Sequence, residues 1–182
     1  VGFRLGANST ATNCHVRNHS TTAARPAYES NAAGVGFVDC EGVSQNGTAF
    51  ISTTTILRMN GCYAHDSNIG ASTTTGAPLI NGSIFEGNRT NCLTSASVVD
   101  GIIQDNLFYG REGKQGTGPQ FTGASSIGHR MFNNILYGLT TAVDVTTAQG
   151  VDDSGFNDYF NNTTDVSNWP KSGSDLAVDP TF

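Results

Sequence analysis

Charged residues are scarce in this sequence, at 13% of its 182 residues. Helices on protein surfaces are usually covered by ion-pairing charges, so this scarcity argues against a helical protein. Lys and Arg total 9 against 15 Asp and Glu, and the net charge of -6 predicts that nucleic acid is not a partner. Long apolar runs are missing as well, so we expect no membrane-spanning segment and no membrane partner.

The polarity of the chain comes instead from Thr, Ser, Asn and 22 Gly residues. Such a composition is compatible with disorder, but the apolar residues recur in a regular register and no long charged run exists. The length predicts one domain, residues 1–182. The chain begins at Val1 rather than at a methionine, which leaves open a longer protein of which this is the C-terminal part.

The segment 126–145 is the clearest structural unit. It predicts a short strand, a corner at Asn133 and Asn134, a second strand at 135–137, a turn at Gly138 and a third strand that ends at Val145. Apolar runs of three or four residues, broken by Asn, Gly and Thr, are too short for helices and suit strands separated by turns.

The same unit recurs along the chain. With Ile135 as the anchor, the comparable anchors are Cys14, Cys40, Cys62, Ile84, Leu107 and Tyr159. Successive anchors lie 26, 22, 22, 23, 28 and 24 residues apart, and each follows Asn, Asp, Gly or Ser, residues that tolerate left-handed corners. Two apolar columns accompany them and are expected to be buried: Phe85, Phe108, Leu136 and Phe160 after the anchor, and Phe37, Met59, Phe132 and Phe156 before it.

This period predicts a solenoid. Helical repeats do not fit Asn-Gly corners and Thr-rich strands, and the frame of a leucine-rich repeat is absent. Three short strands per repeat predict an all-β parallel β-helix of about seven rungs, roughly 35 Å long at about 4.8 Å per rung. Stacked Asn residues at the corners are expected to satisfy one another by amide ladders.

Cys14, Cys40 and Cys62 are expected to stack in one interior column because all three are anchors. Adjacent rungs are within disulfide reach, but buried free thiols pack well without oxidation, and we favour the reduced form. The spacings match no zinc motif, so no metal site is predicted.

Two segments are expected to depart from the repeat. The Gly-rich stretch 109–123 (YGREGKQGTGPQFTG) is predicted to be a mobile surface loop. The segment 165–182 is predicted to be a C-terminal cap, with Leu176, Val178 and Phe182 folding over the open end.

The corner-and-anchor units TNCHV, VDCEG, NGCYA, QDNLF, NNILY and NDYFNN, with the closing DYFNNTTDV and DLAVDPTF, carry a resemblance that covers nearly the whole chain. The chain resembles the right-handed parallel β-helix proteins of the pectin-lyase-like superfamily, and most of all the virion β-helix proteins of bacteriophages. The resemblance implies the fold. The superfamily includes polysaccharide lyases, polygalacturonases, pectin methylesterases and phage proteins, so it leaves the function open.

Motifs of the enzymes in that superfamily are not found, and no catalytic, cofactor-binding or metal-binding residue and no cofactor is predicted. Asp39 and Glu41 flank Cys40 and are expected to point outward as a solvated acidic pair, while Asp105 and Asp144 are assigned to corners and solvated faces. The four histidines, His15, His19, His65 and His129, are scattered and are interpreted as surface or corner residues.

The expected function is a non-catalytic structural or adhesive module of a phage virion, as a head decoration, tail fibre or spike. The alternative is a polysaccharide-degrading lyase or hydrolase. Open β-edges add other chains, so we expect a homo-oligomer, a trimer or a lattice element, that docks on a larger virion assembly through its N-terminal end. Surface glycans are a further candidate partner. The expected location is the virion, with an extracellular protein as the alternative.

Overall fold

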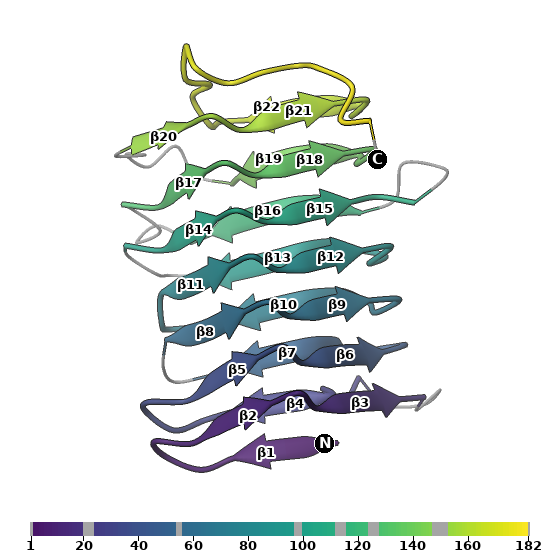
Figure 1. Cartoon of the computed structure of the whole chain (residues 1–182), viewed down its shortest axis with the longest axis vertical. Helices are drawn as coiled ribbons and strands as arrows, with labels where there is room; N and C mark the ends of the chain where they lie inside the picture. The colour runs from purple at the N-terminus through teal and green to yellow at the C-terminus, as the bar shows by residue number, and fades with distance from the viewer. Residues whose placement is uncertain are drawn as a thin grey trace.

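A computed structural model of the chain describes residues 2–19, 24–53, 56–96, 100–111, 116–123, 128–146 and 153–181. Within these ranges the chain forms 22 β-strands and no helix. The strands stack into a rod in which each turn of the chain lies above the preceding one (Figure 1). The all-β solenoid expected from the repeat is confirmed.

Three parallel sheets run along the rod. The first, sheet A, contains β1 (Phe3–Leu5), β4 (Tyr28–Ser30), β7 (Thr48–Ser52), β10 (Ile69–Thr73), β13 (Asn91–Ala96), β16 (Thr117–Thr122), β19 (Thr141–Val145) and β22 (Thr164–Ser167). Sheet B contains β2 (Thr10–Thr12), β5 (Gly36–Val38), β8 (Leu57–Asn60), β11 (Pro78–Asn81), β14 (Ile102–Gln104), β17 (Arg130–Phe132) and β20 (Asp153–Gly155). Sheet C contains β3 (His15–Asn18), β6 (Glu41–Ser44), β9 (Tyr63–His65), β12 (Ile84–Glu86), β15 (Leu107–Tyr109), β18 (Ile135–Tyr137) and β21 (Asp158–Phe160).

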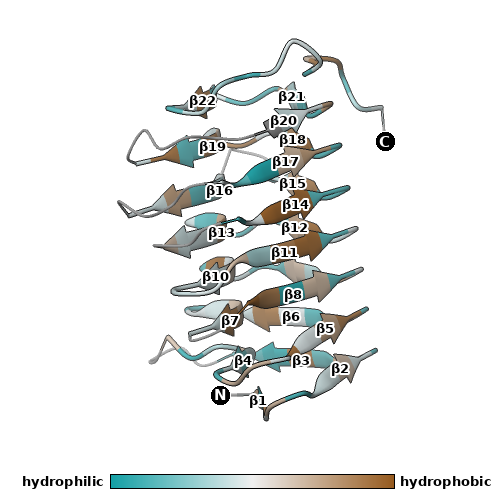
Figure 2. Cartoon of the chain, turned by 90° about the vertical axis from the view of Figure 1, so that its left-hand side faces the viewer, coloured by the Kyte–Doolittle hydropathy of each residue, from teal (hydrophilic) through white to brown (hydrophobic). Residues whose placement is uncertain are grey.

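Every strand pairs with the strand three places along the chain, so each turn contributes one strand to each sheet. Figure 2 shows sheet B from its outer side, with β2 at the bottom and β20 near the top. Sheets B and C each contain seven strands, so there are six steps from one turn to the next along each sheet. The rod therefore makes about six turns, slightly fewer than the seven expected.

The core is a set of side-chain stacks that follow the rod axis. Tyr28 and Phe50 are fully buried and stack face to face at 4.7 Å, with Phe37 packed edge-on against both. Higher in the rod Phe85 stacks on Phe108 at 5.0 Å. Each turn buries its apolar residues against the same positions of its neighbours, which is the source of stability in a solenoid.

The unit at 126–145 forms as its sequence predicts over its described residues. Strand β17 leads into the corner at Asn133 and Asn134, β18 follows, Gly138 turns the chain with φ +66°, and β19 ends the unit. The residues 124–127 lie outside the described part of the chain.

The corner between sheets B and C is made by one left-handed residue in every turn. These residues have φ between 50° and 63° and are Asn13, Asp39, Gly61, Gly82, Asp105, Asn133 and Phe156. Asn, Asp and Gly are the residues that reach this region at least cost. The corners expected from Asn13, Asp39 and Gly61 are confirmed.

Each left-handed residue is followed by a side chain that points inward. We call these side chains the buried column, which consists of Cys14, Cys40, Cys62, Ser83, Asn106, Asn134 and Asn157. All but the half-buried Cys14, at the N-terminal end, are buried. The three cysteines are therefore stacked as expected, and each is a free thiol.

The anchors chosen higher in the rod were wrong. Ile84, Leu107 and Ile135 are in register with one another and with Glu41 and Tyr63, one residue beyond the level of the cysteines, and Ile84 is 42% exposed. Tyr159 is displaced by one residue more, because it pairs with Leu136. The inward position of these turns is polar, because an Asn or Ser side chain satisfies the backbone of the bend, and the apolar residue after it faces outward.

Hydrogen bonds join the upper part of this column. Asn106, Asn134 and Asp175 each offer Oδ1 to the backbone N–H of the turn below, at 2.9 Å to Ser83, 3.1 Å to Asn106 and 2.9 Å to Asn157 respectively. The amide ladder expected at the corners is thus present, with an aspartate at its end. Lower in the rod the thiols of Cys40 and Cys62 donate to the carbonyls of Ala11 and Phe37.

Three of the phenylalanines expected in the core are not there. Phe132 and Phe160 are half-buried on the outer sides of β17 and β21, and Phe156 occupies a left-handed corner with 66% of its surface exposed. The inward positions beside them belong to Met131, Tyr159 and Asn157. The sequence alignment was displaced by one residue, and in a strand such a displacement exchanges the buried and exposed faces.

The exposed corner phenylalanine leads to a stability prediction. Replacing Phe156 by Asn is expected to raise the free energy of unfolding by about 1 kcal/mol, since a bulky residue is disfavoured in the left-handed region. Replacing the buried Phe108 by Ala should instead lower it by about 3–5 kcal/mol. Urea denaturation followed by fluorescence measures both changes, and destabilisation by Phe156→Asn comparable to that of Phe108→Ala would contradict the assignment.

The predicted surface loop 109–123 is partly strand. Tyr109 ends β15, and Thr117–Thr122 form β16 in the middle of sheet A, with Pro119 and Phe121 buried. Gly and Pro were interpreted as loop signals, but Gly118 is required by packing: a Cβ there would collide with the backbone oxygen of Ala142. Residues 112–115 lie outside the described part of the chain.

The C-terminal segment crosses the upper end of the rod (Figure 1). Trp169 is buried and stacks on Phe121 at 5.4 Å, and the backbone of Leu176 bonds to Asn157 and Tyr159. The side chains of Leu176 and Val178 are more than half exposed, so they do not cover the end as expected. Phe182 lies outside the described residues.

Candidate functional site

Ionisable side chains gather on the outer face of the N-terminal half of sheet C. They come from successive turns: His15 and Arg17 from β3, Glu41 from β6, Tyr63 and His65 from β9, Asp66 after it, Glu86 from β12, and Arg111 after β15. We call this set the charged cluster. Parallel register places cluster residues from different turns, 23 to 45 positions apart in the sequence, within hydrogen-bond distance of one another.

Glu41 is the centre of the cluster. Its side chain is 17% exposed and is contacted by His15 Nδ1 at 2.7 Å, Arg17 Nη2 at 2.8 Å and His65 Nε2 at 3.1 Å. The hydrogen bond from His65, together with those from His15 and Arg17, lowers the pKa of Glu41 to about 2, against the opposing effect of burial. This carboxylate is therefore ionised and fully engaged at neutral pH.

The second carboxylate of the cluster, Glu86, is engaged in the same way. It accepts hydrogen bonds from Tyr63 Oη and from Arg111 Nε, the latter at 2.8 Å. Burial acts to raise the pKa of Glu86, but Tyr63 and Arg111 outweigh it and lower the pKa. Burial and the bond to Glu86 raise the pKa of Tyr63 to about 12. The phenol is thus a donor, not a base.

His65 and Asp66 join the two carboxylates. His65 is 7% exposed, stacks on the Tyr63 ring at 4.1 Å, and places Nδ1 2.8 Å from Asp66 Oδ2. Asp66 Oδ1 is bound in turn by Arg111 Nη1. Both ring nitrogens of His65 face carboxylate oxygens, and both donate only in the protonated ring. The result is one continuous network from His15 to Arg111.

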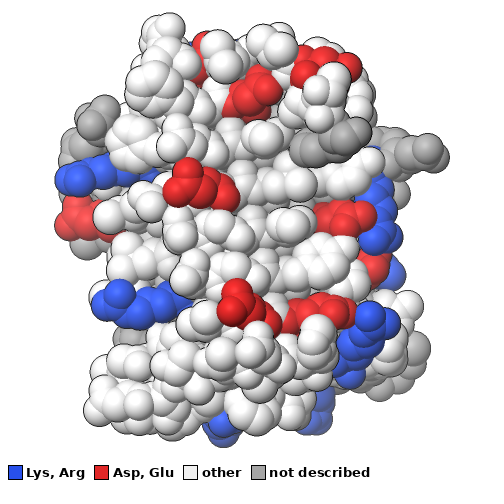
Figure 3. All heavy atoms as spheres, in the orientation of Figure 1, with Lys and Arg blue, Asp and Glu red and all other residues white. Residues whose placement is uncertain are grey.

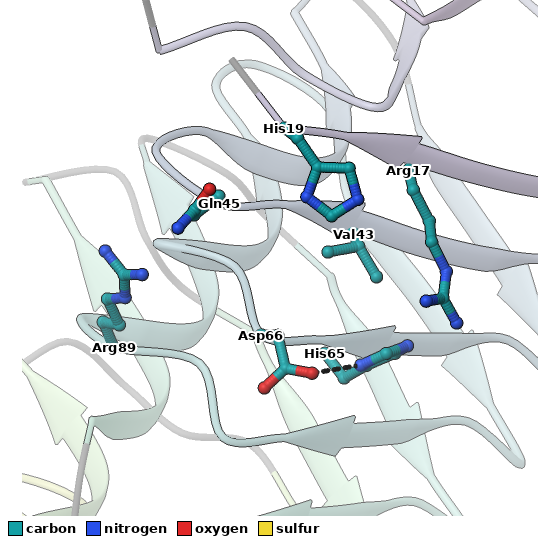
Figure 4. A pocket seen from close by; sticks show the side chains of 7 residues that line it. All are labelled: Arg17, His19, Val43, Gln45, His65, Asp66 and Arg89. Carbon is teal, nitrogen blue, oxygen red and sulfur yellow. Dashed lines mark hydrogen bonds and ion pairs between the residues drawn. The ribbon is translucent and has the colours of Figure 1, made fainter. Parts of the chain in front are cut away.

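A hollow of about 220 Å³ adjoins this network where the chain turns from sheet C to sheet A. Its lining residues, shown in Figure 4, are Arg17, His19, Val43, Gln45, His65, Asp66 and Arg89. We call it the corner hollow. Figure 3 shows Lys and Arg side chains along the right-hand edge of the rod, interleaved with Asp and Glu.

Above the charged cluster the same face becomes apolar and aromatic. Tyr109, Tyr137 and Phe160 are in register on β15, β18 and β21, with ring centroids 5.4 Å and 5.9 Å apart. Beside this aromatic column runs a second outward row that contains Ile84, Leu107 and Ile135. Aromatic rings that are partly open to solvent offer apolar contact area with polar tips.

The outcome for the other acids is mixed. Asp39 and Asp105 occupy exposed left-handed corners, as assigned, and Asp105 accepts a bond from Asn133. Asp144 lies on the outer side of β19 and accepts a bond from Gln120. The expectation that Asp39 and Glu41 form a solvated pair was wrong, because only Asp39 is solvent-exposed and Glu41 is held by Arg17 and two histidines.

The four histidines fall into two groups by solvent exposure. His15 and His19 are exposed, as interpreted from the sequence. His65 is in the charged cluster and His129 is 2% exposed, stacked on Phe121 at 4.2 Å. The surface interpretation was therefore wrong for His65 and His129.

Sequence analysis did not identify the charged cluster. One signal for it exists: when the turns are aligned on their left-handed corners, His15, Glu41 and Tyr63 share one position. His65 reaches Glu41 from two residues further along its strand, a diagonal contact that no alignment of the turns displays.

Among the described residues no group of three or more His, Cys, Asp and Glu side chains is arranged to hold a metal ion. In the same part of the chain no helix is long and apolar enough to cross a membrane. Comparisons with protein-family models, with curated proteins and with solved structures found no match to this chain.

The low pKa of Glu41 gives a pH-dependent prediction. A carboxylate whose pKa is lower in the folded than in the unfolded state stabilises the protein above its unfolded pKa, about 4.5, and this stability is lost as the pH falls toward about 2. The difference in free energy of unfolding between the parent and Glu41→Gln should shrink over that range. Urea denaturation at pH 7, 4.5 and 2.5 measures it.

The uncharged variant Ile84→Ala, on the same face, is the control for that experiment. Its difference from the parent should stay constant with pH because it removes no titrating group. A constant difference for Glu41→Gln as well would show that Glu41 is not held by its partners.

Proposed function

We propose that this chain is a non-catalytic structural or adhesive β-helix module of a bacteriophage virion, serving as a head decoration, tail fibre or spike. The observation that carries the non-catalytic part is the state of the outward acids. Glu41 and Glu86, the two glutamates of the charged cluster, are each bound by an arginine and by further donors. General acid catalysis needs a carboxyl with a raised pKa, and both of these are lowered.

The fold supports the structural part of the proposal. A short solenoid with long parallel sheets is a rigid rod whose outer faces are available to other chains. The aromatic column and the row of Ile84, Leu107 and Ile135 provide an apolar strip on sheet C. We propose that this strip packs against further copies of the chain in a trimer or lattice, or contacts surface glycans. The virion assignment rests on the sequence resemblance to phage β-helix proteins.

The test compares assembly and chemistry in the same preparations. Oligomeric state is measured by light scattering after size exclusion, and depolymerisation is followed on uronate-containing and neutral polysaccharides. The parent should assemble and cleave nothing. Tyr137→Ala should weaken assembly, whereas Asp39→Ala, Glu41→Ala, Asp105→Ala and Asp144→Ala should leave the absence of cleavage unchanged. A monomer at all concentrations that binds no glycan would refute the proposal.

A polysaccharide-degrading lyase or hydrolase is the second candidate, and one observation favours it. Glu41 and Glu86 lie two strands apart and two residues out of register on one face, with Tyr63 and His65 between them. Their backbone positions are roughly 12 Å apart at about 4.8 Å per strand and 3.3 Å per residue. Inverting glycosidases hold two carboxyl groups about 6.5–9.5 Å apart, somewhat closer than this backbone spacing. Depolymerisation by the parent that is abolished in both Glu41→Gln and Glu86→Gln would establish this candidate in place of the first.

A further inference from the structure

The corner hollow gathers hydrogen-bond donors from four successive turns of the rod. Arg17 and His19 come from the first, Gln45 from the second, His65 from the third and Arg89 from the fourth. In Figure 4 Arg89 and Arg17 stand on opposite sides of the hollow, with His19 and Gln45 on its upper rim. The volume of about 220 Å³ is sufficient for a small polyatomic group.

The charge in this hollow is opposite to that of the whole chain. Two arginines line it against a single acid, Asp66, whereas the chain carries 15 acidic residues against 9 Lys and Arg. Two histidines add further ring nitrogens to the lining. Asp66 is already bound by His65 on one oxygen and by Arg111 on the other. Its negative charge is therefore balanced by groups outside the hollow or at its floor.

Arg89 is the arginine of the corner hollow that no acidic side chain among the described residues binds. Its backbone N–H bonds to Ser67 O at 2.9 Å, but across the described ranges its exposed guanidinium forms no ion pair. Arg17 uses Nη2 on Glu41, and a guanidinium has five N–H donors, so others remain for a ligand. Figure 4 shows the two guanidinium groups apart from each other, on the two sides of the hollow.

We infer that the corner hollow is a binding site for a tetrahedral oxoanion, a phosphate or sulfate group. Donors that converge from several directions fit a group with three or four acceptor oxygens. A planar carboxylate is better matched by one arginine that binds it bidentately. This inference goes beyond the proposed function, because the hollow can bind an anion whether or not the rod assembles or contacts glycans.

Inorganic phosphate and inorganic sulfate are the probes, with acetate as the planar comparison. Each is titrated at constant ionic strength into the parent protein, with binding followed by calorimetry and by the NMR signals of arginine Nε–H and histidine ring protons. One or both tetrahedral anions should bind saturably and shift the signals of Arg17, Arg89 and His19. Tighter binding of phosphate would identify the ligand group as a phosphate, and tighter binding of sulfate would identify it as a sulfate.

Variants test the site directly. Arg89→Gln should weaken binding about tenfold or more, since a charge-assisted hydrogen bond contributes at least that much. Asp66→Asn should strengthen it, because the variant removes a negative charge from the lining. Arg58→Gln is the matched control: Arg58 is an exposed arginine on β8 of sheet B, away from the hollow, and its loss should leave the affinity unchanged.

Three results would overturn the inference. One is the absence of saturation by phosphate and sulfate up to about 20 mM, weaker than any site of this kind should be. Another is an equal loss of affinity in Arg58→Gln and Arg89→Gln, which would indicate general charge attraction. The third is acetate binding as tightly as both tetrahedral anions. If Arg89→Gln unfolds, His19→Gln replaces it with the same expected direction.

Discussion

Replacing Asn134 by Ala is expected to lower the free energy of unfolding by about 4 kcal/mol, because it leaves several buried groups without partners at an estimated 1–3 kcal/mol each. Asn134 is fully buried. Its Oδ1 accepts from the backbone N–H and from Nδ2 of Asn106, and its Nδ2 donates to Ile103 O and to Asn157 Oδ1. The partner groups on Asn106, Ile103 and Asn157 are buried as well, so they are out of contact with bulk solvent.

The measurement is equilibrium denaturation in urea, with Asn133→Gly as the control. Asn133 is the exposed neighbour of Asn134 and adopts φ 52°, a conformation that glycine reaches freely. This control should change stability by no more than about 0.5 kcal/mol. Equal effects of the two substitutions would show that the amide ladder contributes no specific stability.

Replacing Gly118 by Ala should cause the second large loss, about 3–5 kcal/mol, the range of severe overpacking in a rigid core. The added Cβ would collide with the backbone oxygen of Ala142 and would lie 3.2 Å from a methyl group of Leu139. The obstructing atom is backbone in the neighbouring strand β19, so no side-chain rotation relieves the contact. Relief requires β16 and β19 to separate.

Gly173→Ala provides the matched control for this substitution. A Cβ at Gly173 meets no atom within 4 Å, and its loss of backbone freedom is the same in kind. Thermal unfolding should therefore show a large decrease in midpoint for Gly118→Ala and little change for Gly173→Ala. Two similar small changes would mean that the segment around Gly118 is loop, as its Gly-rich sequence suggested.

Much of the fold could be predicted because local chemistry repeats in every turn. The corners at Asn13 and Asp39 and the stack of Cys14, Cys40 and Cys62 follow from residues that tolerate left-handed φ and from small side chains that pack inside. The period alone identified the solenoid. These features depend on sequence neighbours and on the spacing between turns.

The register was harder because the interior is not uniformly apolar. In each of these turns a buried polar residue, such as Asn106 or Asn134, is followed by an outward apolar one, such as the exposed Ile84 after Ser83. Hydrophobicity therefore predicted that the wrong one of the two residues points inward. The same displacement placed Phe156 in the core. Its aromatic ring lies outside because the hydrogen bonds of Asn157 determine the inward direction at that turn.

The charged cluster was beyond sequence analysis for a different reason. Glu41 contacts His15 and His65 only once the register between turns is fixed, and its partial burial depends on side chains from β3 and β9. In the sequence alone, nothing in the type or position of any one of these residues distinguishes it from an ordinary surface residue.

The buried column has a direction along the rod. Its upper members are Ser83, Asn106, Asn134 and Asn157. The backbone N–H of each of the first three donates to the side chain of the next member, and that of Asn157 donates to Asp175. A turn that has just formed therefore holds an N–H that only the next part of the chain can satisfy. During synthesis the N-terminal turns emerge first. Each new turn therefore packs onto an edge whose backbone N–H still lacks an acceptor. Asp175, whose carboxylate also binds the Ser172 N–H, ends this templated growth with its own local turn.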